Sequence, residues 1–114
     1  MPAIILRRMQ QVITQQHDLD PDGNPAGGFS RGSGIDIRWQ NGPLGRGANR
    51  QEPNGAFVEG VIQAARGRLQ HYQLGKFACR ENALALTKLE EALHWLNHRT
   101  ADREDRGVEG THGQ

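Results

Sequence analysis

The side chains best suited to chemistry are aromatic, arginine and amide groups near the ends of predicted elements. Phe77 lies on a connection, and Arg80 and Asn82 begin the helix that follows it. Trp39 and Asn41 end a predicted strand, and three arginines follow the helix: Arg99, Arg103 and Arg106. Aromatic faces stack on bases, guanidinium groups and helix N-terminal amides bind phosphates, and side-chain amides bind base edges. The set predicts a nucleotide site, although composition alone favours two ordinary core aromatics.

A second phosphate-binding hypothesis concerns the glycine-rich stretch 17–34, which contains Ser30, Arg31 and Ser33. Successive backbone N–H groups in such a stretch can cradle an anion. Composition favours a plainer interpretation, a flexible hairpin loop without a ligand. Both interpretations place a long turn-rich connection here.

Metal and catalytic sites receive weaker support. Glu91, His94 and His98 follow helical spacing and could ligate a metal, but carboxylate di-metal bundles repeat this motif on several helices and the chain has it once. Cys79 could be a nucleophile at a helix start, yet no His and Asn stand in a fixed relation to it, which favours a packed thiol. We therefore expect no metal, no cofactor, no catalytic residue and no enzymatic activity; a nucleotide hydrolase would need a general base that the sequence does not offer.

Two helices must position the candidate residues. Residues 77–97 are rich in strong helix formers, and their leucines recur at helical spacing, giving one apolar stripe: Leu86, Leu89, Leu93 and Leu96. Residues 56–72 form the other predicted helix, with Asn54 as its N-cap and Gly75 as its C-cap. A short connection over 74–77 then makes an antiparallel hairpin. Gly60 and Gly67 stand seven apart, which suits close packing against a neighbouring helix.

The remaining chain predicts a small sheet, loops and a tail. Residues 35–40 alternate apolar and polar side chains, as a half-buried strand does, and we expect them to pair with residues 9–16. The fold class is therefore α+β: an antiparallel two-helix hairpin with a small N-terminal antiparallel β-meander, oligomerising through the helices. We expect one domain, 1–114, with a β-rich and loop region (1–52), the hairpin (53–101) and a tail (102–114) whose alternating charges are typical of solvated, disordered chain.

Composition narrows the class of protein. The chain has 114 residues, 35% hydrophobic residues and 15 glycines, so a lone monomer would have a thin core and self-association is expected. A formal net charge of +1 argues against binding a nucleic-acid polymer by bulk charge. One cysteine suits a reducing compartment, and the apolar segments are too short for a membrane span or a signal peptide. These features predict a cytosolic protein.

The hairpin sequence carries a family resemblance. Residues 77–95 (FACRENALALTKLEEALHW), 34–43 (GIDIRWQNGP), 54–59 (NGAFVE) and the tail from 99 to 112 resemble the phage Thoeris anti-defence sponge family, which shares its helical hairpin with a shorter anti-CBASS sponge. The resemblance covers roughly residues 34–112. It implies a non-enzymatic protein that sequesters cyclic ADP-ribose isomers made by Thoeris TIR proteins, in the cytoplasm of an infected bacterium.

The resemblance also implies roles and partners. Phe77 would stack on adenine, Asn82 would contact a base or ribose, and Arg103 or Arg106, with a contribution from Arg50, would clamp the pyrophosphate. The tail would become a lid. The full set of expected ligand contacts is Phe77, Asn82, Arg103, Arg106, Arg50, Trp39, Asn41, Arg80, Thr111 and His112.

Assembly and ligand range follow from the same resemblance. Family members pair as homodimers, and some form homohexamers, trimers of dimers, that hold cyclic trinucleotides at separate sites. No nucleic-acid polymer and no membrane is implied as a partner, and the preferred cyclic isomer is left open. The alternative is an oligomeric protein-interaction module that blocks a host protein through the charged helical face around Lys88, Glu90 and Glu91.

Overall fold

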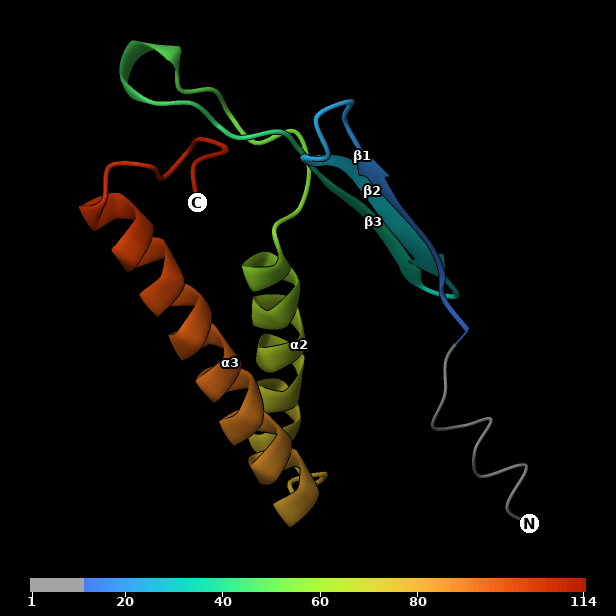
Figure 1. Ribbon diagram of the computed structural model, residues 1–114. Helices are drawn as coiled ribbons and strands as arrows, with labels where there is room; N and C mark the ends of the chain where they lie inside the picture. The colour runs from blue at the N-terminus through green and yellow to red at the C-terminus, as the bar shows by residue number, and fades with distance from the viewer. Residues whose placement is uncertain (1–11) are drawn as a thin grey trace.

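A computed structural model describes residues 12–114 as a three-stranded sheet followed by a helical hairpin (Figure 1). The elements in chain order are β1 (Thr14–Leu19), β2 (Pro25–Gly32), β3 (Ile35–Asn41), the short 3-10 helix η1 (Gly47–Asn49), α2 (Val58–Gln73) and α3 (Arg80–Asp105). The strands are antiparallel in the order β1-β2-β3. This layout confirms the predicted α+β class with its meander and its two-helix hairpin.

Strand β2 corrects the predicted pairing. The prediction of a turn-rich connection over 17–34 is wrong, because β2 occupies the centre of the sheet and separates β1 from β3. Residues 14–16 therefore pair with β2 and not with 35–40, while 9–11 lie outside the described residues. Glycine is needed here: Gly28 has φ +126°, and a Cβ at this position would lie 2.0 Å from the carbonyl oxygen of Gln16. The glycines that suggested a loop permit close strand packing.

Ser30 ties the three strands together through side chains. Its hydroxyl accepts a hydrogen bond from Trp39 Nε1 (2.9 Å) on β3 and donates one to Gln15 Oε1 (2.7 Å) on β1. Ser30 is 3% exposed, so water cannot replace these partners. Both phosphate-cradle and flexible-loop interpretations are wrong for Ser30, because its backbone lies in the central strand, paired with β1 on one side and β3 on the other. The neighbouring Arg31 pairs with Asp36 at 3.2 Å.

Substituting Ser30 with alanine is expected to destabilise the protein by about 1–2 kcal/mol, because it removes two hydrogen bonds and leaves the part-buried indole N–H of Trp39 without this partner. Denaturant unfolding of Ser30→Ala, Trp39→Phe and the double variant measures this contribution. Because both single changes break one shared bond, the double variant should lose less than their sum. Strict additivity would show that the bond contributes nothing to stability.

Asn54 holds the link between the sheet and the hairpin. It is not the N-cap of α2, so that prediction is wrong. Its side-chain amide accepts a bond from the Asn41 N–H (2.8 Å) and donates one to the Asn41 carbonyl (3.0 Å), which continues the ladder of β3. Ala56 then bridges β3 through its own backbone, with Gln40 N–H donating to its carbonyl at 2.9 Å. The N-cap of α2 is Phe57, and no side chain caps it.

The hairpin turn is closed by a second amide clamp. Gln73 donates to the Cys79 carbonyl (3.0 Å) and accepts from the Cys79 N–H (2.9 Å), which fixes the entry to α3. The C-cap of α2 is Leu74 in the right-handed conformation, so the prediction of Gly75 as C-cap is wrong. Helix α3 runs to Asp105, eight residues beyond the predicted end at 97.

The hydrophobic core is small. In the described part of the chain, Leu93 and Ser30 are the buried residues, while Leu86, Leu89 and Leu96 are half-buried on the α3 stripe, which confirms that stripe. Between residues 12 and 114 no helix packs on the sheet, and no helix is long and apolar enough to cross a membrane. Several large apolar side chains are exposed, among them Leu74, Phe77 and Trp95. One copy of the chain leaves much apolar surface uncovered.

Candidate functional site

The predicted ligand residues lie in two places at opposite ends of α3. Phe77, Arg80 and Asn82 lie at the hairpin turn, and we name them the turn corner. The others lie around the end of β3, the end of α3 and the tail, and we name them the tail end: Trp39, Asn41, Arg50, Arg103, Arg106, Thr111 and His112. At 1.5 Å rise per residue, Asn82 and Arg103 are separated by about 30 Å. One chain cannot bring both groups to one small molecule.

The turn corner presents an aromatic ring to solvent. Phe77 is 70% exposed, although it is apolar and lies on an ordered turn. Asn82 Nδ2 donates a long hydrogen bond (3.5 Å) to the Phe77 carbonyl, and Lys76 Nζ lies 5.6 Å from the ring centroid. An exposed ring with an amide and a cation beside it can stack on a base and attract an anionic ligand. The contacts that Phe77 makes within this chain leave most of its ring uncovered.

The tail end contains two adjoining hollows. One, of about 540 Å³, is lined by Arg50, Arg99, Arg103 and the tail residues 109–111, with the Phe57 side chain among them. The other, of about 780 Å³, extends along Trp39, Arg103, Thr111 and His112 to the β1–β2 turn. Several residues line both hollows, so they form one continuous region between sheet, hairpin and tail: Pro25, Pro43, Phe57, Arg99, Arg103 and Thr111. Both volumes are in the range of small-molecule sites.

Arg103 fastens the tail to α3. Its guanidinium donates to the carbonyls of Val108 (3.1 Å), Thr111 (2.9 Å) and Gly113. The tail therefore folds back over the end of the helix, which overturns the expectation of disorder after the helix (Figure 1). The role of Arg103 as a phosphate contact stays a prediction, and its donors are largely engaged by the tail in this structure.

Arg50 holds the tail from the other side. Its two terminal nitrogens form a fork with Glu109, at 2.7 Å to Oε2 and 3.0 Å to Oε1. These hydrogen bonds from Arg50, reinforced by the charges of Arg46 and Arg103, lower the pKa of Glu109 below its usual value. The same hydrogen bonds raise the pKa of Arg50. Glu109 is thus ionised at neutral pH in a cluster of three guanidinium groups.

The other predicted contacts have structural partners of their own. Arg106 Nε pairs with Asp102 at 3.0 Å, and Arg106 caps the end of α3 while lining neither hollow. Trp39 binds Ser30 through its indole N–H, and Asn41 is bound to Asn54 through its backbone. None of these bonds tests the predicted ligand contacts.

The hairpin identifies the family. A family model described as Acb2/Tad1, hairpin domain, matches residues 32–101. The chain belongs to the Acb2/Tad1 hairpin family. One curated relative, named Thoeris anti-defense 1, from Bacillus phage SBSphiJ7, is 53% identical over 76 residues, which are 67% of this chain and 51% of the relative. The chain thus spans about half the length of that relative, and the predicted resemblance to the Thoeris anti-defence family is confirmed.

The Acb2/Tad1 match covers the turn corner and ends before the tail. Phe77, Arg80 and Asn82 fall inside the matched span, as do Trp39, Asn41 and Arg50, whereas Arg103, Arg106, Thr111 and His112 lie beyond it. Glu109 was not among the predicted site residues. No local pattern could have revealed it, because Arg50 and Glu109 are far apart in the sequence and meet only when the tail folds back.

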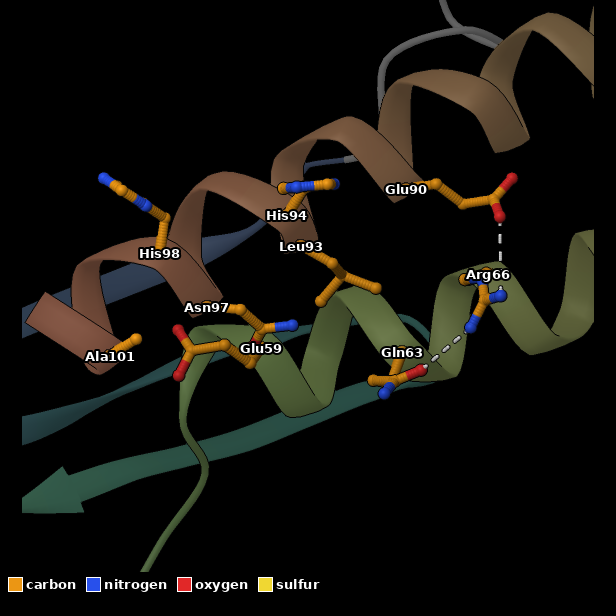
Figure 2. Close-up of a pocket in the computed structure, with 9 residues that line it drawn as sticks. All are labelled: Glu59, Gln63, Arg66, Glu90, Leu93, His94, Asn97, His98 and Ala101. Carbon is orange, nitrogen blue, oxygen red and sulfur yellow. Dashed lines mark hydrogen bonds and ion pairs between the residues drawn. The ribbon is translucent and has the colours of Figure 1, made fainter. Parts of the chain in front are cut away.

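A further groove lies between the two helices of the Acb2/Tad1 hairpin (Figure 2). Leu93 points from α3 towards α2, while Arg66 on α2 reaches across the groove to Glu90 (3.5 Å) and also donates to Gln63 (3.5 Å) on its own helix. A second cross-helix pair joins Arg99 to Glu59 at 3.5 Å. This groove contains none of the ten predicted ligand residues, so it supports the hairpin rather than the predicted site.

Proposed function

We propose that this protein is a phage anti-defence sponge. It binds cyclic ADP-ribose isomers made by Thoeris TIR proteins and sequesters them without cleaving them, in the cytoplasm of the infected bacterium. Cyclic trinucleotides of CBASS systems are a second proposed ligand class, at separate sites. Family membership and the name of the Bacillus phage relative support an anti-Thoeris role.

The observation that carries the proposal is the exposed ring of Phe77. Burial of an aromatic ring is strongly favourable, so an aromatic left 70% exposed at the hairpin turn suits a partner that arrives from outside. Adenine is such a partner, because every base has a face that stacks on an aromatic ring. Arginines at the tail end then suit the pyrophosphate. A binding protein needs no general base, and none is required here.

The two halves of the site meet in a homodimer. When two hairpins pair about a two-fold axis across their helices, the turn corner of one protomer lies beside the tail end of its partner. This arrangement brings the separated groups together twice and gives two equivalent pockets. It also covers apolar side chains exposed in one copy, such as Trp95 and Leu84. Three such dimers would make the proposed homohexamer.

Release of intact ligand tests sequestration. The protein is incubated with a cyclic ADP-ribose isomer, freed of unbound ligand by filtration, and then denatured by heat. We expect the unchanged isomer in the supernatant, identified by its mass and by its chromatographic retention time, because binding through stacking and phosphate contacts breaks no covalent bond.

Two other outcomes would favour rival functions. A linear ADP-ribose product would indicate hydrolysis and an enzyme. No retained nucleotide, together with a host protein captured by the charged face of α3, would favour a protein-interaction module. Lys88 and Glu91, 3.6 Å apart on that face, are the residues to reverse in that case.

A further inference from the structure

A carboxylate of the chain itself lies among the arginines at the tail end. Glu109 lies between the guanidinium groups of Arg46 and Arg50: Arg50 binds its carboxylate through the two-point fork, and Arg46 Nη1 donates to its backbone carbonyl at 3.1 Å. The Arg50–Glu109 pair also lines both the hollow of about 540 Å³ and a smaller one of about 330 Å³. An anion bound in either hollow would therefore lie near this pair.

The contact is built into the backbone as well. Gly45 N–H donates to the Gly110 carbonyl at 2.8 Å, and Gly110 has φ +77°, a left-handed conformation that glycine adopts without strain. A Cβ at Gly110 would lie 2.4 Å from the Gly45 carbonyl oxygen. The tail therefore approaches the 44–50 loop closely, and this approach places Glu109 beside Arg50 in the empty protein.

We propose that Glu109 is a built-in competitor for the anionic group of the ligand. In the empty protein its carboxylate takes the place at Arg50 that a phosphate oxygen takes in the complex. Both groups bind a guanidinium through the same two-point geometry, and a phosphate carries the higher charge. Ligand binding then exchanges one anion for the other at Arg50 and frees Glu109, while Arg103 still holds the tail through its carbonyl contacts.

This inference rests on the proposed function. The Arg50–Glu109 pair could also have the opposite role, and the two roles predict opposite changes in ligand affinity. If the Arg50–Glu109 fork instead closed the tail over a bound ligand, removing it would weaken binding. If Glu109 competes, removing its charge strengthens binding. The sign of one change in affinity therefore separates the two roles.

The test uses inorganic pyrophosphate as the probe, titrated into the full-length protein by calorimetry. Glu109→Gln is expected to bind about two- to fivefold more tightly than wild type, which is the range for loss of one competing, partly exposed ion pair. The matched control is Glu104→Gln. Glu104 lines the smaller hollow together with Arg50 and interacts with Arg50 by charge, without a hydrogen bond. Removing the charge of Glu104 should therefore change the affinity for pyrophosphate less.

Three further measurements complete the test. In an Arg50→Ala background the Glu109→Gln change should have no effect, and any remaining gain would overturn the exchange. Hydrogen exchange at the Gly45 amide should quicken on pyrophosphate addition, since its partner Gly110 moves with Glu109. Unchanged or weaker binding by Glu109→Gln, or no pyrophosphate binding by any variant, refutes the competitor role. Retention of a cyclic ADP-ribose isomer by the wild type is measured separately, so the sponge function can survive that refutation.

Discussion

Replacing Phe77 with alanine is expected to weaken binding of a cyclic ADP-ribose isomer by about ten- to a hundredfold, because a base stacked on an aromatic ring contributes about 1–3 kcal/mol. The ring is 70% exposed, so its removal leaves no cavity and the unfolding temperature should not change. Titration calorimetry measures the affinity, and differential scanning calorimetry measures the unfolding temperature.

Leu74→Ala is the matched control for Phe77. Leu74 is an apolar residue on the same turn, 89% exposed, and it is not a predicted ligand contact. We expect it to bind ligand as the wild type does. An unchanged affinity in Phe77→Ala would remove the turn corner from the site, and equal losses in both variants would indicate that the turn acts through its general apolar surface.

The second large effect is complementation between two defective variants. Arg106→Ala should lose ligand affinity about tenfold or more, since hydrogen bonds to a charged group contribute about 1.5–3 kcal/mol. Its exposed ion pair with Asp102 adds little to stability, so the fold should persist. When Phe77→Ala and Arg106→Ala chains are unfolded and refolded together in equal amounts, about one quarter of the wild-type binding sites should return.

The expected quarter follows from a site shared between protomers. Half of the refolded dimers contain one chain of each kind, and each of these has one site with both substitutions and one site with neither. If the site were built within one chain, every site would carry a substitution and nothing would return. Sedimentation of the mixture checks that dimers form, and a monomer throughout would contradict the shared site.

The regular elements could be predicted because their signals are local. Leu86, Leu89, Leu93 and Leu96 follow helical spacing, and the structure places all four on the buried side of α3. Residues 35–40 alternate in polarity, and β3 spans Ile35–Asn41. In both cases the apolar side chains that recur in the sequence are the ones that pack in the structure, so the sequence pattern predicts the element.

Other features depend on contacts that the local sequence does not display. Strand β2 was hidden because Gly28 is required by the backbone of Gln16, a neighbour in space. Asn54 has the residue type of an N-cap, but its amide binds the Asn41 backbone instead. The residue type indicates which roles a side chain can have, and its tertiary contacts determine which of those roles it has in the folded protein.

The candidate site also has a part that could be predicted from the local sequence and a part that could not. The aromatic and amide of the turn corner lie close in sequence, so the sequence could group them. The tail end depends on a chain reversal that brings Arg50 to Glu109, so the sequence predicts the arginine as a site residue and not its carboxylate partner. In the proposed homodimer a second copy of the chain joins the two ends, and no local pattern in the sequence specifies that arrangement.

The amide clamp at the hairpin turn has a practical consequence. It fixes the backbone of Cys79, the one cysteine in the chain, and leaves its thiol exposed. A spin label attached there would be held at a defined point at the start of the 26-residue helix α3. In two antiparallel hairpins the labels would lie about 40 Å apart, the length of that helix, and in two parallel hairpins they would be neighbours. The protein therefore carries an attachment point from which the relative direction of its copies can be measured as a distance.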